Sequence, residues 1–137
     1  MPRPEVTVHR IRLRGPWLLE LVAAPDSPRT VRLPLPWGEL IECGAGRLRL
    51  SRRFNRPTNL GPGDRVSVVV GELPNEALVS LNGTTLEQHP GHTNQDSVFD
   101  ISHLEPSNLL TVEFDVSTTS PARDDAWGEV ALLISSQ

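Results

Sequence analysis

The chain has 137 residues, of which 37% are hydrophobic and 22% are charged. This length suits one ordinary domain, so we expect residues 1–137 to fold as a single unit around a packed core. The formal net charge of −4 excludes a general electrostatic attraction to nucleic acid or to an anionic membrane.

The chain contains a single cysteine, Cys43, so we expect no internal disulfide and no cysteine-based metal site. Residues 1–15 lack the apolar segment of a signal peptide, and no run of about 18 apolar residues occurs anywhere in the sequence. These features predict a soluble, cytoplasmic protein.

Short strands are predicted from the start of the chain. Val6 and Val8 are out of phase with Ile11 and Leu13, which predicts a bulge near residues 9–10. Residues 17–22 form an apolar run that is typical of a core strand. A cluster of alanine, proline, aspartate and serine at residues 24–28 predicts a turn. Trp37 follows two prolines that block regular pairing, and we expect its ring to pack in the core; an exposed Trp37 would instead be a stacking residue or a partner anchor.

Apolar residues alternate with a period of two through the middle and the end of the chain. The apolar faces of five strands consist of Leu48, Leu50 and Phe54; Val66, Val68 and Val70; Ala77, Val79 and Leu81; Leu110, Val112, Phe114 and Val116; and Val130, Leu132 and Ile134. Asn82-Gly83 is the signal for a tight hairpin turn. The arginines at positions 47, 49, 52, 53 and 56 are typical of the wet face of a half-buried strand. Short strands at this spacing predict an all-β sandwich or barrel.

Six motifs follow one another in a specific order between about Arg47 and Ile134. They are Arg52-Arg53-Phe54, Val79-Ser80-Leu81-Asn82-Gly83, His89-Pro90-Gly91, Phe99-Asp100-Ile101, Leu104-Glu105-Pro106-Ser107-Asn108 and Leu110-Thr111-Val112. This order resembles the sugar-binding domain that precedes the catalytic barrel in family-two glycoside hydrolases, the relatives of β-galactosidase, β-glucuronidase and β-mannosidase. The resemblance implies an all-β, jelly-roll β-sandwich of about eight or more antiparallel strands, of the galactose-binding-domain-like kind.

The sequence departs from that family where its hydrolases reach toward their substrate. Pro74 stands where the family often has Asp or Asn, so Asn75 matches only after a shift of one residue. Gly128 stands where the family has an Arg after a late Trp. The catalytic barrel with its paired Glu residues has no counterpart in this sequence. The resemblance therefore implies no sugar hydrolysis, and we expect the chain not to be an enzyme.

The most site-like cluster is the stretch from Asp124 to Trp127. An aromatic face beside carboxylates suits a pyranose, because the ring stacks and the acids accept hydrogen bonds from hydroxyl groups. The predicted ligand-binding residues are Trp127, Asp124, Asp125, Asn75, His89 and His92. The alternative interpretation is that Trp127 closes one end of the sandwich while the two aspartates only solvate the loop before it.

Other polar residues indicate neither a metal centre nor a catalytic site. The two histidines of the 89–92 loop have a spacing that zinc sites use, but the resemblance explains this loop as architecture. We expect no cofactor other than a structural calcium ion, for which Asp96 and Asp100, with loop carbonyls, are candidate oxygen ligands. Ser102 and His103 are neighbours on a strand and point to opposite faces, which argues against a shared proton. No catalytic residue is predicted.

Two functions fit these patterns. The first hypothesis is a non-catalytic, carbohydrate-binding-like module whose ligand the sequence does not name. The second is a structural or protein-interaction module that keeps the fold without sugar binding and pairs through an exposed sheet face or edge. The expected partners are accordingly a carbohydrate, a second copy of the chain or another protein, and neither nucleic acid nor a membrane.

Overall fold

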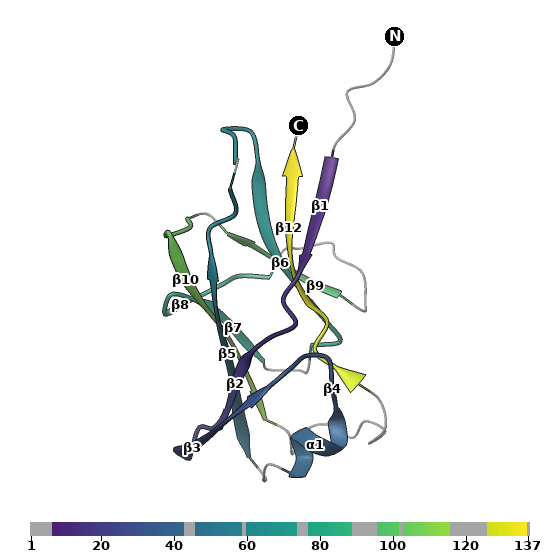
Figure 1. The fold of residues 1–137 in the computed structure, drawn as a ribbon, viewed down its shortest axis with the longest axis vertical. Helices are drawn as coiled ribbons and strands as arrows, with labels where there is room; N and C mark the ends of the chain where they lie inside the picture. Colours follow the sequence, from purple (N-terminus) through teal and green to yellow (C-terminus); the bar gives the residue numbers. More distant parts are fainter. Residues whose placement is uncertain are drawn as a thin grey trace.

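The computed structural model describes residues 7–42, 46–58, 60–73, 77–88, 96–101, 103–115 and 126–136. Nearly all of the regular structure in these ranges is β-strand (Figure 1). The elements are β1 (Thr7–Arg12), β2 (Trp17–Leu21), β3 (Ala24–Val31), β4 (Leu35–Pro36), α1 (Trp37–Glu42), β5 (Arg47–Asn55), β6 (Arg65–Gly71), β7 (Leu78–Leu81), β8 (Thr84–Thr85), β9 (Asp96–Ile101), β10 (Ser107–Asp115), β11 (Ala126–Trp127) and β12 (Val130–Ser136).

Two antiparallel sheets pack on each other as a β-sandwich. One sheet has the strand order β1-β12-β6-β9, and the other has the order β3-β2-β5-β10-β7-β8. The short strands β4 and β11 pair with each other at one end of the sandwich. From β5 to β12 the longer strands alternate between the two sheets, as they do in a jelly roll. The predicted fold class, an all-β sandwich of antiparallel strands, is confirmed.

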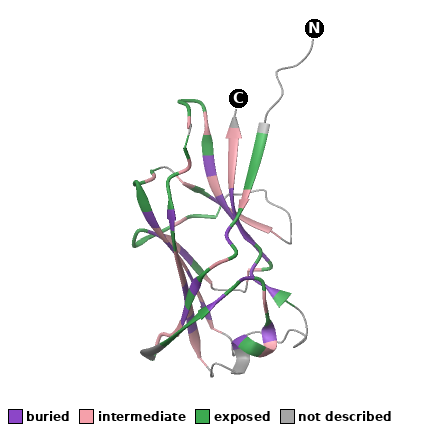
Figure 2. Ribbon diagram, in the orientation of Figure 1, coloured by how far each residue is buried: buried purple, intermediate pink, exposed green. Residues whose placement is uncertain are grey.

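The core lies between the sheets and is built from every second residue of the strands. In β10, for example, Leu110, Val112 and Phe114 are at most 1% exposed, whereas the residues between them are only half-buried. Leu48 and Leu50 do the same in the neighbouring β5. Figure 2 shows buried residues recurring along the strands of both sheets. The period-two pattern of the sequence therefore marks the core faces correctly in these strands.

The bulge predicted near residues 9–10 is wrong. β1 pairs residue by residue with β12, from Thr7 opposite Ser136 to Arg12 opposite Ala131, without a shift in register. The two apolar phases are reconciled in another way, because Val8 is 57% exposed and faces solvent.

The turn predicted at residues 24–28 is also wrong. The chain turns at residues 22–23, and β3 then begins at Ala24. β3 is an edge strand of the six-stranded sheet, and an edge tolerates prolines because their missing N–H groups would face solvent. A shift in register between Leu19 and Leu21 of β2 accompanies this pairing.

The predicted hairpin turn is confirmed and is locked by a buried amide. Asn82 and Gly83 have φ values of 52° and 85°, the two positive values that the tight turn needs. The Asn82 side chain donates to Oδ1 of Asn108 at 3.0 Å and accepts from the backbone N–H of Leu109 at 2.8 Å. Asn108 is fully buried and also exchanges two hydrogen bonds with the backbone of Glu105. Two of the six motifs therefore serve the architecture.

Trp37 begins α1 and is 4% exposed, so its predicted packing is confirmed. The helical part of the described chain is too short to cross a membrane.

Candidate functional site

The Trp127 side chain lies in the core at one end of the sandwich. Its ring is 1% exposed, and its centroid lies 4.9 Å from that of Phe114 and 5.8 Å from that of Trp37. Its Nε1–H donates to the carbonyl oxygen of Glu72 at 3.0 Å. These are the contacts of the packing alternative, and they leave no open ring face on which a sugar could stack.

The other five predicted site residues lie outside the described residues: Asn75, His89, His92, Asp124 and Asp125. Their part in ligand binding stays a prediction. The described residues around Trp127 enclose a hollow of about 180 Å³, which Glu72, Asp96 and Glu129 help to line. This volume lies below the range of about 300–1,000 Å³ that is usual for pockets of drug-sized ligands.

Asp96 and Asp100 do not form the calcium site that was considered for them. They are four residues apart in β9, which at about 3.4 Å per residue separates their Cα atoms by about 14 Å. One calcium ion holds its ligands at about 2.5 Å and cannot bridge that span. Asp96 lies opposite Gly71, and Asp100 lies opposite Ser67. Within the part of the chain that the structure describes, no three metal-binding side chains gather.

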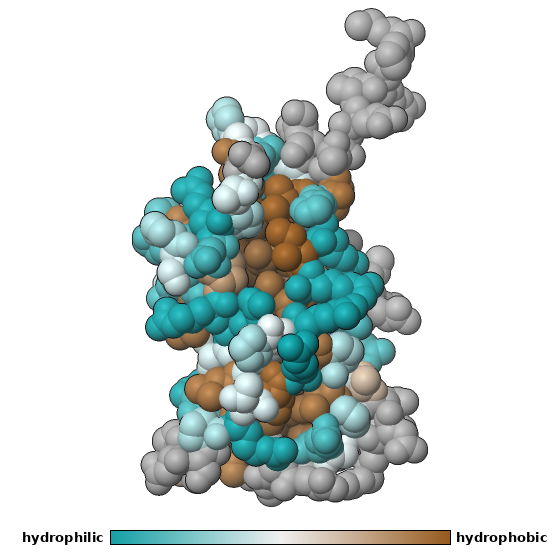
Figure 3. All heavy atoms as spheres, viewed as in Figure 1, coloured by the Kyte–Doolittle hydropathy of each residue, from teal (hydrophilic) through white to brown (hydrophobic). Residues whose placement is uncertain are grey.

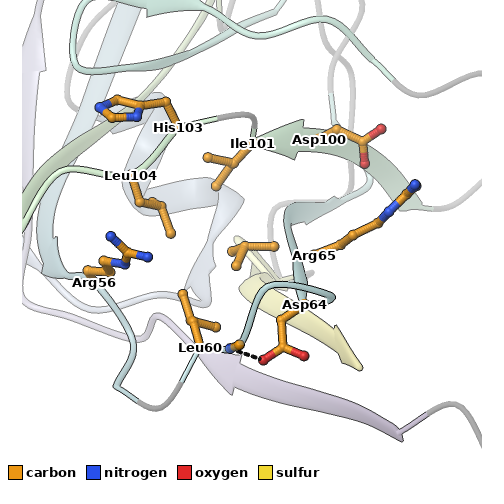
Figure 4. Close-up of a pocket in the computed structure, with 10 residues that line it drawn as sticks. Arg56, Leu60, Asp64, Arg65, Asp100, Ile101, His103 and Leu104 are labelled. Atoms are coloured by element: carbon orange, nitrogen blue, oxygen red, sulfur yellow. Dashed lines mark hydrogen bonds between the residues drawn. The ribbon is translucent and has the colours of Figure 1, made fainter. Parts of the chain in front are cut away.

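A larger cavity, of about 400 Å³, lies at the opposite end of the β6–β9 pair (Figure 4). Its walls come from the segment that links β5 to β6, from the start of β6, and from the end of β9 with the residues that follow. The residues that line it are Arg56, Leu60, Gly61, Asp64, Arg65, Val66, Asp100, Ile101, His103 and Leu104.

The floor of this cavity is apolar and fixed by sheet pairing. Val66 and Ile101 are opposite each other in the β6–β9 ladder, and Leu60 and Leu104 pack against the same core. The loop beside the floor is held by a closed turn. The backbone N–H of Asp64 donates to the carbonyl of Gly61 at 3.1 Å, and that of Gly61 donates to the Asp64 carboxylate at 2.8 Å.

The rim of the cavity is charged. Arg56 and Arg65 are exposed, and no described residue forms an ion pair with either guanidinium. In Figure 4 the Arg56 side chain is directed toward Leu104, and the Arg65 side chain extends on the Asp100 side. Asp100 accepts a hydrogen bond from the Ser67 hydroxyl at 3.2 Å. The rim thus offers two uncommitted cations next to carboxylate acceptors.

His103 completes the rim on the side away from Asp100 (Figure 4). Its Nε2 lies 3.0 Å from a carboxylate oxygen of Glu105, and both side chains are well exposed. Because the pair is open to solvent, it stabilises the fold only weakly.

Sequence patterns did not single out this cavity. Arg56 belongs to the group of arginines interpreted as a wet strand face. The pairing of β6 with β9 is what brings the segment after β5 next to the end of β9, and a single sequence does not reveal which strands pair. The turn from Gly61 to Asp64, followed at once by Arg65, was the available signal.

The fold is similar to parts of solved β-glucuronidases. The chain matches an FMN-binding β-glucuronidase from Faecalibacterium prausnitzii L2-6 with 25% identity and a TM-score of 0.69, covering 96% of this chain and 23% of that one. It matches a Bifidobacterium dentium β-glucuronidase complexed with coumarin-3-O-glucuronide with 18% identity and a TM-score of 0.67, covering 98% and 31%. It matches a Ruminococcus gnavus β-glucuronidase in complex with uronic deoxynojirimycin with 15% identity and a TM-score of 0.69, covering 99% of this chain and 30% of that one.

No protein-family model matches the sequence, and no curated protein matches it either. The chain spans less than a third of the length of the solved enzymes named above. Their similarity extends over almost all of this chain, so each enzyme contains one β-sandwich of this kind within a longer polypeptide. The chain therefore has the fold of the β-sandwich part of β-glucuronidases, as its six motifs predict.

Proposed function

We propose that the chain is a non-catalytic carbohydrate-binding module, and that its site is the cavity between the 60–66 segment and the end of β9 with His103 and Leu104. The observation that carries this proposal is the combination of a cavity of about 400 Å³ with an apolar floor and uncommitted arginines on its rim. That volume lies in the range of small-ligand pockets, about 300–1,000 Å³. The similarity to sandwich parts of β-glucuronidases is compatible with such a role.

Each part of the cavity suits one part of a sugar. A pyranose has a C–H face that can lie on the apolar floor formed by Val66 and Ile101, where contact removes apolar surface from water. Arg56 and Arg65 can donate hydrogen bonds to hydroxyl oxygens or to a ring carboxylate.

The proposal is one of binding without turnover. Among the residues that the structure describes, the cavity lining includes no serine, threonine or cysteine that could act as a nucleophile. The Asp64 carboxylate is held by the backbone N–H of Gly61, where it closes a turn. Incubation with 4-nitrophenyl β-glucuronide should accordingly release no 4-nitrophenol above the rate without protein.

Isothermal titration calorimetry with a panel of mono- and oligosaccharides, neutral and acidic, tests the binding. We expect saturable binding of one sugar class that Arg65→Gln weakens at least about tenfold, the loss expected when one charge-assisted hydrogen bond is removed. Arg10→Gln is the matched control, because Arg10 is an exposed arginine of β1 that lies outside the cavity. Binding that Arg65→Gln leaves unchanged, or no binding by any sugar of the panel, would contradict the proposal.

The second hypothesis, a protein-interaction module, is favoured by a different feature. It concerns a basic edge of β5, at residues 52–55, whose hollows share no lining residue with the cavity.

A further inference from the structure

Arg52 occupies a core-facing position in β5. The buried residues of this strand are Leu48, Leu50 and Phe54, and Arg52 is in phase with them. Its neighbours Arg47 and Arg49 are out of phase and form ion pairs with Glu113 on the outer face. The interpretation of all these arginines as one wet face is therefore wrong for Arg52.

The Arg52 guanidinium is incompletely satisfied. It donates only to two backbone carbonyls, those of Arg53 at 3.1 Å and Gly15 at 3.3 Å. Its Nε–H is buried and has no hydrogen-bond partner, and no carboxylate of the described residues pairs with it. Burial lowers the pKa of the guanidinium below its usual value, as expected for a cation without a compensating anion. A buried donor without an acceptor is costly and calls for an explanation.

Arg52 stands where β5 becomes an open edge. The pairing between β2 and β5 ends at Leu18 opposite Ser51, and from Arg52 to Asn55 the strand pairs only with β10. One row of its backbone groups therefore has no neighbouring strand in the described part of the chain. Such an edge is a template for an added strand.

A hollow lies on each side of this edge. One, of about 350 Å³, is lined by Ile11, Leu13, Phe54 and Leu132 among others, and the second, of about 300 Å³, is lined by Pro16, Trp17, Leu18 and Leu109 among others. Both include Arg52 and Arg53 in their walls, so they meet at these two residues. Figure 3 shows two hydrophobic areas on one face of the molecule, separated by a band of hydrophilic side chains.

We propose that the open edge of β5 at residues 52–55 binds an extended segment of a partner protein in which a carboxylate is flanked by apolar residues. The carboxylate accepts from the fork of Arg52 once this side chain shifts toward the edge, and its orphan Nε–H then gains an acceptor. The partner backbone pairs with β5, and the flanking side chains enter the two hollows.

Charge complementarity specifies an acidic segment. Arg12, Arg52 and Arg53 all line the hollow of about 350 Å³, and no described residue forms an ion pair with any of them. None of the described residues that line this hollow carries a carboxylate. The local charge is thus strongly positive although the chain as a whole is negative, and it attracts an acidic segment and repels a basic one.

The test follows the Nε–H signals of arginine in ¹⁵N-labelled full-length protein by NMR, with the Arg52 signal assigned from its absence in Arg52→Lys. The probes are the peptide acetyl-Ser-Leu-Val-Asp-Leu-Val-Ser-amide and the same peptide with Asn in place of Asp. We expect the Asp peptide, and not the Asn peptide, to shift the Arg52 signal saturably. Arg52→Met should weaken binding of the Asp peptide at least about tenfold, whereas the charge-matched Arg65→Gln should leave it within about twofold.

Equal binding of the two peptides, equal binding by wild type and Arg52→Met, or no shift of the Arg52 signal would each overturn the proposal. Sodium glucuronate tests whether a small free carboxylate binds at Arg52 instead. If it shifts the Arg52 signal saturably and the Asp peptide does not, the proposal of a protein partner is overturned. The comparison of the two peptides on wild-type protein stays decisive even if Arg52→Met does not fold.

Discussion

Replacement of Asn108 by alanine tests whether this motif residue holds together β5, the Asn82-Gly83 turn and the segment before β10. Asn108 is the one fully buried polar side chain of the described core, and its amide joins three segments. Its Oδ1 accepts from Asn82 at 3.0 Å and from the Glu105 backbone at 2.9 Å. Its Nδ2 donates to the carbonyls of Glu105 at 2.8 Å and Phe54 at 3.4 Å. Asn108→Ala removes all four bonds.

The size of the loss follows from these distances. Three of the four bonds are short, and a neutral hydrogen bond contributes about 1 kcal/mol each. The partners include backbone groups at a buried position, and leaving one without a partner costs about 1–3 kcal/mol more. We therefore expect Asn108→Ala to lower the free energy of unfolding by about 4–6 kcal/mol. Asn55→Ala, at an exposed position at the end of β5, should change it by no more than about 0.5 kcal/mol.

Equilibrium unfolding in urea, followed by tryptophan fluorescence, measures this difference. Trp17, Trp37 and Trp127 are all at most 4% exposed, so unfolding changes the surroundings of every tryptophan. The slope of the unfolding free energy against urea should be unchanged, so that the midpoint alone moves. A loss below about 1 kcal/mol with an unchanged slope would refute the architectural role of the Asn108 network.

Three further predictions concern stability. Gly128→Ala should lower the free energy of unfolding by about 3 kcal/mol in urea titrations, because Gly128 has φ +114° and an added Cβ would lie 2.8 Å from Leu33. Gly63→Ala is the control and should be nearly neutral, because a Cβ added there meets nothing within 4 Å. Trp127→Ala should lower the free energy of unfolding by about 3–5 kcal/mol in the same measurement, and should leave the sugar affinity of the folded fraction unchanged. A selective loss of sugar binding would instead support Trp127 as a ligand residue. Arg52→Met should not lower the unfolding free energy, because the loss of two weak hydrogen bonds is offset by removal of an unsatisfied buried donor. Burial lowers the pKa of Arg52 in the folded state, but an arginine stays charged near neutral pH. The difference in unfolding free energy between Arg52→Met and wild type should therefore be the same at about pH 6 and about pH 8. A change between the two pH values would refute the reasoning.

The central strands could be predicted because their residues satisfy two demands at once. In β10 the alternation of apolar and polar residues matches the two faces of a half-buried sheet, so the pattern and the fold agree. The Asn82-Gly83 turn was predictable for the same reason, since its two positive φ values restrict the residues that fit.

The edges of the sheets could not be predicted in this way. β3 tolerates prolines, and Val8 of β1 tolerates exposure, because an edge strand has a free side that relaxes the usual rules. Residue patterns also failed at Arg52, whose core-facing position became evident only from the burial of its neighbours in β5. The candidate cavity escaped prediction because the segment after β5 and the end of β9 come together only through the pairing of β6 with β9.

The most direct test of carbohydrate binding at the candidate cavity is a methyl and indole NMR titration with the sugar panel. The two ends of the sandwich carry different reporters, since Val66, Ile101 and Leu104 line the cavity and Trp127 lies at the opposite end. We predict that one sugar class shifts the methyl signals of these three residues saturably and leaves the Trp127 indole signal unchanged. Shifts confined to the Trp127 indole, or no saturable shift with any sugar of the panel, would contradict the proposed site.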